Sequence, residues 1–355
     1  MPSKKIKVLI VDDSALVRKL LSEILSNDPL IEVIGAAGNP YFASRIIKEQ
    51  IPDVITLDVE MPKMDGLTFL KILMSQKPIP VVIISSLTEK NSLTALKALE
   101  LGAVEVIQKP TIKAISDPKN NSRLHLIDIV KASAEAKIKK AKKSFPIKKD
   151  TSAHPAIEHI STNQSSMIKT TEKVVVIGAS TGGTEALKEI LTTLPYDTPA
   201  IAIVQHMPEI FTKSFADRLN DICNIKVKEA ENGDTLLRGQ ALIAPGNKHM
   251  LIKRSGAKYF VQLSDDEPVN RHRPSVDVLF NSAARYVGQN CIGIILTGMG
   301  KDGAKGLLTL KNSGSDTIAQ DEASSVVFGM PKEAIRINAA KKVIPLKNIS
   351  NAIFG

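Results

Sequence analysis

Residues 6–21, IKVLIVDDSALVRKLL, join two apolar patterns of different period. The run 6–11 is almost continuously apolar, as expected of a strand buried on both faces, and it ends at Asp12 and Asp13. Beyond them, apolar residues at positions 16, 17, 20, 21, 24 and 25 recur with the period of a helix face. A buried strand that leads directly into an amphipathic helix predicts a parallel α/β sheet.

The same unit recurs through the first third of the chain. Four more apolar runs follow at 31–36, 53–58, 81–85 and 103–108, with amphipathic segments between them. Strands that alternate with helices are joined by right-handed crossovers. We therefore expect residues 1–125 to form a doubly wound (βα)5 domain of the flavodoxin-like type.

A second α/β domain is predicted after a basic segment. A helical pattern at Leu124, Ile127, Val130, Ala134 and Ile138 is expected to close the first domain and to run on into lysines. Residues 142–172 then turn to Lys, Ser, Thr, Pro and His with little periodicity, so we expect 126–172 to be a basic flexible linker. Strands are expected again at 174–178, 200–205, 291–296 and 316–320, with helical patterns between them. Residues 225–265 favour β-hairpins with turns at 245–248 and 255–258. We expect residues 173–355 to form a mainly parallel, doubly wound sheet with a hairpin region.

The charge of the chain is unevenly distributed. Of the formal net charge of +10, residues 126–173 carry +5, against +2 before them and +3 after them. The basic run KIKKAKKSFPIKK lacks interleaved aromatics and an adjacent recognition-helix pattern, so we expect no nucleic-acid partner.

Composition also predicts the compartment. The two cysteines, Cys223 and Cys291, are isolated in apolar contexts, which favours a reducing environment without disulfides. The N-terminal lysines pass straight into a strand-like run, unlike a signal peptide. No apolar stretch approaches the roughly 20 residues needed to cross a bilayer. We expect a cytoplasmic protein without stable membrane insertion.

Polar residues gather at the carboxyl ends of the first-domain strands, where ligands of such sheets bind. They are Asp12, Asp13, Asp58, Ser85 and Lys109. Each residue alone has an ordinary explanation, such as helix capping by the aspartates. Together, three carboxylates at one rim suit Mg²⁺, with Asp58 as a phosphoryl acceptor and Lys109 and Ser85 as ligands of the phosphoryl oxygens.

These motifs, VLIVDDSALVRKLL, LDVEMPKMDGL, VVIISSLT and VIQKP, closely resemble the receiver domain of two-component response regulators. The resemblance implies that a histidine kinase phosphorylates Asp58. Val106 departs from the pattern, because many receivers carry an aromatic switch residue there.

The loop after the run 174–178, within VVVIGASTGG, poses a choice between a phosphate-binding loop and a nucleophile. A Walker loop would place Lys before Ser or Thr after its last glycine, but Thr184 follows Gly183. A Rossmann site would want an acid at the end of the next strand, which ends in Gln205 and His206 instead. Both nucleotide interpretations are therefore disfavoured.

The nucleophile interpretation places Ser180 and His206 in the loops after two neighbouring strands, with Asp302 in the loop after a third strand, all at the carboxyl edge of the sheet. The GxSxG elbow of α/β-hydrolases is absent. Glycines at 178, 182 and 183 are expected to let the backbone approach a substrate, and the helix after Gly183 to offer oxyanion donors. Alternatively, Ser180 and Asp302 cap helices and His206 binds only backbone.

The motifs VIGASTGG, QHMP, IAPGNKHM, NRHRPSVDVLF, LTGMGKDG and AQDEASSVVFGMPKEA closely resemble the chemotaxis protein-glutamate methylesterase family, called CheB. The resemblance implies a Ser180, His206 and Asp302 triad. It also implies hydrolysis of glutamyl γ-methyl esters, releasing methanol, and deamidation of glutamines on methyl-accepting chemotaxis receptors.

From the same resemblance, Thr181 and Met299 are pocket or oxyanion candidates, and no cofactor is expected in this half. His249 and His272 are either structural or substrate-facing. The rival functions are a DNA-binding regulator, disfavoured by the long α/β output region, and a receiver-regulated receptor-docking protein without catalysis.

Overall fold

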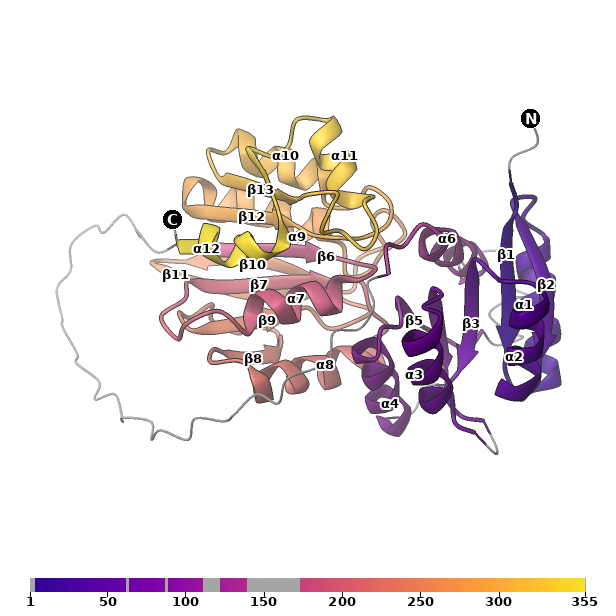
Figure 1. The fold of residues 1–355 in the computed structure, drawn as a ribbon. Coiled ribbons are helices and arrows are strands. Elements are labelled where there is room, and N and C mark those ends of the chain that lie inside the picture. The colour runs from indigo at the N-terminus through magenta and orange to yellow at the C-terminus, as the bar shows by residue number, and fades with distance from the viewer. Residues whose placement is uncertain (1–3, 62–63, 87–88, 111–121, 139–172, 355) are drawn as a thin grey trace.

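The computed structural model describes residues 4–61, 64–86, 89–110, 122–138 and 173–354, which form two α/β domains side by side (Figure 1). The lysine-rich segment predicted as a linker lies mostly outside these described residues.

The N-terminal domain has five parallel strands in the order β2-β1-β3-β4-β5. Their bounds are β1 Ile6–Val11, β2 Ile31–Ala37, β3 Val54–Asp58, β4 Val81–Ser85 and β5 Glu105–Gln108. The helices are α1 Ala15–Ser26, α2 Pro40–Glu49, α3 Gly66–Gln76, α4 Glu89–Glu100 and α6 Ser122–Ala134. The predicted strands and the doubly wound topology are confirmed.

Two apolar clusters cover the two faces of this sheet. Helices α1 and α6 pack with Val8, Ile84 and Ile107 on one face. Helices α2, α3 and α4 pack with Leu57 and Val106 on the other. Side chains of a strand point alternately to opposite faces, which explains why neighbouring β5 residues join different clusters.

The predicted face of α6 is wrong in part. Leu126, Ile129 and Val130 are the buried residues of α6 that join the apolar cluster on the receiver sheet, whereas Leu124 is 48% exposed. The helix ends at Ala134, before Ile138. The buried side therefore shares Val130 with the predicted stripe, but it centres on Leu126 and Ile129 rather than on Leu124.

The C-terminal sheet has seven parallel strands in the order β14-β13-β12-β6-β7-β9-β8. Their bounds are β6 Val174–Ala179, β7 Ala200–Gln205, β8 Lys226–Glu229, β9 Gln240–Ile243, β12 Cys291–Ile295, β13 Asp316–Gln320 and β14 Lys342–Ile344. The chain leaves β6 for β7 on one side and later returns to β12 on the other. The carboxyl end of β6 is therefore the topological switch point, where α/β sheets bind their ligands.

Helices cover both faces of this sheet. The helices α7 Gly183–Leu191, α8 Glu209–Ile222 and α12 Ile349–Phe354 pack on one face. On the other lie α9 Val276–Tyr286, α10 Ala304–Asn312 and α11 Met330–Arg336, together with the hairpin of β10 His249–Ser255 and β11 Lys258–Ser264. Short 3-10 turns occur at Gly288–Asn290 and Leu346–Asn348.

Of the two predicted hairpin turns, the one at 255–258 is confirmed and the one at 245–248 is wrong. Strands β10 and β11 pair antiparallel around the predicted turn at 255–258. The turn at 245–248 joins no hairpin, because β9 pairs parallel with β7 and β8 in the main sheet while β10 belongs to a separate sheet. Short apolar runs do not reveal whether neighbours pair parallel or antiparallel.

The two domains meet through α4 and α6 of the first (Figure 1). Helix α4 packs along α8, where the Ser92 and Ser214 hydroxyls lie 2.9 Å apart and Arg218 binds Glu100 at 3.0 Å. One apolar cluster runs through both domains. The carboxyl edge of the second sheet thus faces the first domain.

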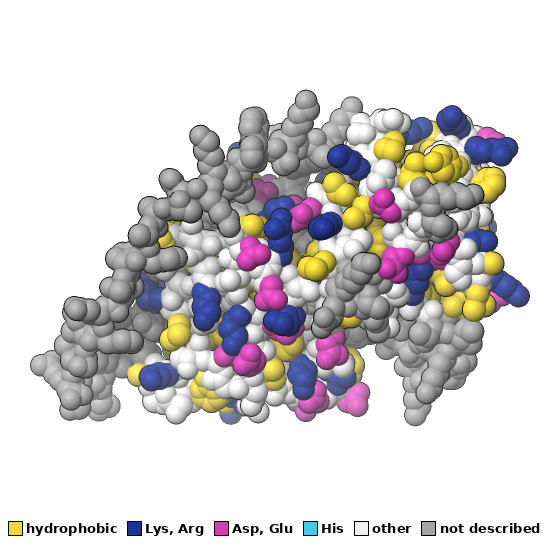
Figure 2. All heavy atoms as spheres, turned by 90° about the horizontal axis from the view of Figure 1, so that it is seen from below, with side chains coloured by type: hydrophobic (Ala, Val, Ile, Leu, Met, Phe, Trp, Pro, Cys, Tyr) yellow, Lys and Arg dark blue, Asp and Glu magenta, His cyan; other side chains and the backbone are white. Residues whose placement is uncertain are grey.

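Two surface features bear on partners. No helix in the described part of the chain has the length and apolar character to span a membrane. Figure 2 shows Lys and Arg side chains interspersed with Asp and Glu over the face seen from below, rather than gathered into one basic surface.

Candidate functional site

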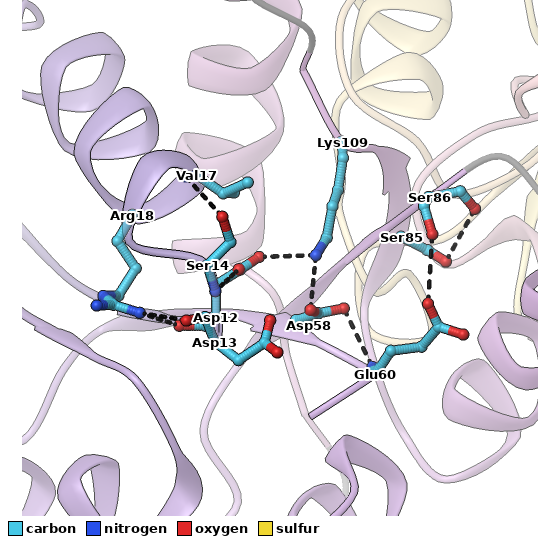
Figure 3. Close-up of polar contacts among 10 residues, drawn as sticks. All are labelled: Asp12, Asp13, Ser14, Val17, Arg18, Asp58, Glu60, Ser85, Ser86 and Lys109. Atoms are coloured by element: carbon cyan, nitrogen blue, oxygen red, sulfur yellow. Dashed lines mark hydrogen bonds and ion pairs between the residues drawn. The ribbon is translucent and has the colours of Figure 1, made fainter. Parts of the chain in front are cut away.

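The five polar residues predicted at the rim of the first sheet lie at its carboxyl edge, and four of them form a charged cluster (Figure 3). Carboxylate oxygens of Asp12, Asp13 and Asp58 lie within 4.8 Å of one another. The Lys109 ammonium lies 2.6 Å from Asp58 Oδ2 and 3.0 Å from Asp12 Oδ2. Asp12 and Asp58 are buried and Asp13 is exposed.

The aspartates do not act as the cap of α1. Ser14 is the N-cap and accepts from the Val17 amide, while Asp12 Oδ1 accepts from the Ser14 amide. Ser85 is buried at the end of β4, and its hydroxyl donates to the Ser86 carbonyl. The capping explanation therefore does not account for the acidic cluster.

The electrostatics of the cluster favour a cation. Burial raises the pKa of Asp58 to about 6, against the opposing effect of Lys109. Burial would lower the pKa of Lys109, but its contacts with Asp58 and Asp12 raise it. Three hard oxygen ligands with a single ammonium fit Mg²⁺, which prefers carboxylates and water.

The second set of predicted residues meets at the switch point of the C-terminal sheet. Ser180 follows β6, His206 follows β7, and Asp302 follows β12. All three are at least nine-tenths buried. Ser180 and His206 line one pocket with Thr181 and Met299.

The His206 imidazole has two different sides. Its Nε2 lies 2.9 Å from Asp302 Oδ2. Its Nδ1 is buried and has no hydrogen-bond partner among the described residues. An imidazole held by a carboxylate on one nitrogen and free on the other is prepared to accept a proton on the free nitrogen.

Asp302 is held by several donors besides His206. The Ser275 hydroxyl donates to Oδ1 at 2.8 Å, Asn270 Nδ2 donates to Oδ1 at 2.7 Å, and the Val276 amide at the start of α9 donates to Oδ2 at 2.7 Å. Burial would raise the pKa of Asp302, but the hydrogen bonds from His206, Asn270 and Ser275 lower it. The carboxylate therefore stays ionised and keeps its orientation.

A buried amide joins the two loops that carry Ser180 and His206. Gln205 Nε2 donates to the carbonyls of Ser180 and His206, each at 3.0 Å. On the other side of the Ser180 loop, the Thr297 hydroxyl donates to the Thr181 carbonyl at 2.9 Å. This role of Gln205 was not predicted from the sequence, where the available signal was its position at a strand end next to His206.

The glycines have a different role from the one predicted. A Cβ on Gly178 would lie 2.2 Å from Val276, and one on Gly183 would lie 2.2 Å from Gln205 Oε1. Gly182 has a φ of 75° and faces Val326. These glycines make room for neighbouring protein side chains at the loop rather than for a substrate.

The structure distinguishes the roles of His249 and His272, which the sequence did not decide. Both ring nitrogens of His249 meet backbone, the Glu267 carbonyl and the Ser275 amide, so His249 is structural. His272 stacks on His206, with ring centroids 3.8 Å apart and planes inclined by 5°. Burial and the adjacent His206 lower the pKa of His272.

The backbone around Ser180 offers two unused donors. The amides of Thr181 and Met299 donate no hydrogen bond within the described part of the chain, whereas the Ser180 amide donates to the Thr297 carbonyl. Free amides beside a nucleophile are the donors that an oxyanion requires.

Comparison with known proteins identifies the family. Residues 175–353 match the CheB methylesterase family model, and residues 8–116 match the response regulator receiver domain model. The chain belongs to the CheB methylesterase family. It is an enzyme that combines a receiver domain with a methylesterase domain.

Its relatives match along the whole length. The protein-glutamate methylesterase/protein-glutamine glutaminase 3 of Geobacter metallireducens is 56% identical over 99% of this chain and 98% of the relative. A protein of the same name, numbered 2, from Rhodospirillum rubrum is 55% identical over 99% and 98%.

A solved structure matches the catalytic half. The crystal structure of the Thermotoga maritima CheB methylesterase catalytic domain shares 43% identity and a TM-score of 0.50, covering 51% of this chain and 96% of that one. The receiver and the CheB catalytic domain expected from the sequence are thus confirmed.

Proposed function

We propose that this chain is a phosphorylation-activated hydrolase of methyl-accepting chemotaxis receptors, demethylating glutamate γ-methyl esters and deamidating selected glutamines. The relatives that match along its whole length carry both activities in their names. The observation that carries the mechanism is the His206 ring, which Asp302 holds at Nε2 and whose buried Nδ1 has no hydrogen-bond partner among the residues that the structure describes.

The catalytic steps follow from these positions. Ser180 Oγ attacks the γ-carbonyl carbon while His206 Nδ1 takes the hydroxyl proton. The C–O bond to the methoxy group then breaks, and the imidazolium returns the proton so that methanol leaves. Water, activated by His206, adds to the acyl-serine and releases the receptor glutamate and free Ser180. An amide substrate loses ammonia in the same way.

Thr181 and Met299 are proposed to stabilise the oxyanion through their backbone amides, which donate to no other group in the described ranges. Asp302 keeps the tautomer of His206 and stabilises the imidazolium. The many donors to Asp302 support this role, because they hold the carboxylate ionised and fixed.

For the receiver we propose that a chemotaxis histidine kinase transfers a phosphoryl group to Asp58. Asp12, Asp13 and Asp58 would hold Mg²⁺, which supplies charge neutralisation at the phosphoryl oxygens. Lys109 and Ser85 would bind the same oxygens and report the modification.

The sequence divides the chain into a receiver at 1–125, a linker at 126–172 and a catalytic domain at 173–355, and we propose a shift of the first boundary. Helix α6 crosses residue 125, and its residues Val130 and Ala134 still pack on the receiver sheet, so we place the end of the receiver at Ala134. We propose a cytoplasmic location, in line with the two free cysteines.

The test is methanol release from membranes that contain methylated receptors, comparing the native chain with Ser180→Ala. Ser255→Ala, at an exposed hairpin position, is the matched control. Loss of release in the first variant and its retention in the second is expected. Equal release by Ser180→Ala would refute the serine mechanism.

A further inference from the structure

A carboxylate of the receiver lies in the catalytic pocket. Glu105 is the first residue of β5, the edge strand of the receiver sheet, and only 8% of it is exposed. It lines the same pocket as Ser180, Thr181 and His206. Two domains thus place an acid and a nucleophile in one cavity.

This carboxylate has few partners. Its Oε1 accepts from the Val106 amide at 3.1 Å, and the Thr181 hydroxyl is within hydrogen-bonding reach. None of the ion pairs among the described residues involves Glu105. Burying a carboxyl group away from a cation is unfavourable, so packing of the sheet alone gives no reason for an acid here.

The direction of the side chain follows from the strand. Val106 packs toward α4 and Ile107 toward α6, and residues two apart in a strand share a face. Glu105 therefore points to the α6 side, where the catalytic domain lies against the receiver. The same strand leads to Lys109, which binds Asp58.

We propose that Glu105 is an internal mimic of the reaction product. A glutamate side chain is what the enzyme leaves on its substrate, and Glu105 presents the same γ-carboxyl group to Thr181 beside Ser180. In the unphosphorylated chain, which we call the closed form, Glu105 thus inhibits the enzyme by occupying the pocket beside Ser180 that the substrate side chain would enter. This inference rests on the proposed function, since the mimicry requires a glutamyl substrate.

The inference also gives Thr181 a role. The hydroxyl that reaches Glu105 in the closed form would meet the γ-carboxyl group of the receptor side chain in the open form. Phosphorylation of Asp58 changes the contacts of Lys109, and β5 joins that lysine directly to Glu105. Withdrawal of β5 would empty the pocket for substrate.

An internal competitor has a kinetic signature. Substrate binds only the open form, in which Glu105 has left the pocket. The apparent KM therefore rises as the fraction of closed enzyme rises, whereas saturating substrate draws all the enzyme into the open form and leaves kcat unchanged. In the unphosphorylated full-length chain, Glu105→Ala is expected to lower the KM for methylated receptors several-fold with kcat unchanged.

The matched control is Glu100→Gln, which removes an ion pair with Arg218 at the same domain interface but outside the pocket. It is expected to change KM far less than Glu105→Ala does. Glu105→Asp keeps the carboxylate but shortens its reach, so an intermediate KM is expected, and this second variant serves if the alanine variant does not fold.

If both Glu105 variants had the KM of the native chain, the proposal that Glu105 mimics the product would be overturned. The same holds if Glu100→Gln lowered KM as much as Glu105→Ala does. Failure of the proposed function looks different, because the native chain would then release no methanol or Ser180→Ala would release as much.

Discussion

The rings of His206 and His272 are stacked in parallel, 3.8 Å apart. His272 in turn meets His125 of α6 edge to face, with centroids 6.1 Å apart. A histidine contributed by the catalytic domain therefore lies between the catalytic base and the receiver.

The stack predicts a positioning role for His272. Its lowered pKa keeps it neutral near pH 7, so it adds no charge beside the imidazolium of His206. We expect His272→Ala to reduce kcat about tenfold or more with a smaller change in KM, because the ring plane of His206 is no longer held. His272→Phe, which can still stack, should recover much of the loss. Equal kcat in native and His272→Ala chains would contradict the role.

Asp302→Asn should be far more damaging. The amide would donate where the carboxylate accepts, which favours the wrong tautomer of His206, and a related change costs about 10⁴ in kcat in serine proteases. The comparison is kcat of methanol release against Asp316→Asn, an exposed aspartate at the start of β13. A loss no larger than that of the control would remove Asp302 from the mechanism.

Gln205→Leu tests the pair of hydrogen bonds through which Gln205 joins the loops of Ser180 and His206. The variant loses both hydrogen bonds to the Ser180 and His206 carbonyls. Leaving buried acceptors without partners should lower the free energy of unfolding by about 1–3 kcal/mol. We also expect kcat to fall more than KM changes, since the Ser180 and His206 loops lose a shared donor. Denaturant melts and steady-state kinetics measure the two effects, and an unchanged kcat would reduce Gln205 to a structural residue.

Removal of Mg²⁺ should separate the two domains functionally. A chelator is expected to abolish phosphorylation of Asp58 by a small-molecule phosphodonor while basal methanol release continues, because the proposed Ser180 mechanism uses only protein groups and water. Phosphorylation is read by mass or mobility shift. Loss of basal release on chelation would contradict the account.

The pH dependence of inhibition follows from Glu105. Burial raises the pKa of Glu105 from 4.5 to about 7 in the closed form. The closed form therefore binds the proton more tightly than the open form, so closure is favoured most below about 4.5 and is lost as pH rises through about 7.

The ratio of KM between the native chain and Glu105→Ala should accordingly fall as pH rises from 6 to 8. Taking this ratio cancels the pH effects on KM of the titratable and charged groups that both chains share in the pocket. Those groups are His125, His206, Arg271, His272 and Arg273. A constant ratio would show that Glu105 does not titrate on closure.

The sequence predicted what depends on strand ends. Ser180, His206 and Asp302 were predicted correctly in the loops after three strands, because residues that follow parallel strands gather at one edge of a sheet. Glu105 was missed because it begins its strand and meets Thr181 and the catalytic pocket only across the domain interface. Strands β8 and β9 were predicted in hairpins because their apolar runs are short, and pairing direction depends on distant segments.

The central claim is tested most directly by methanol release from methylated receptor membranes, with and without a small-molecule phosphodonor. The native chain should accelerate on addition of the donor, Asp58→Asn should keep only its basal rate, and Ser180→Ala should release no methanol in either condition. Equal acceleration of Asp58→Asn, or release by Ser180→Ala, would contradict a receiver-controlled serine hydrolase.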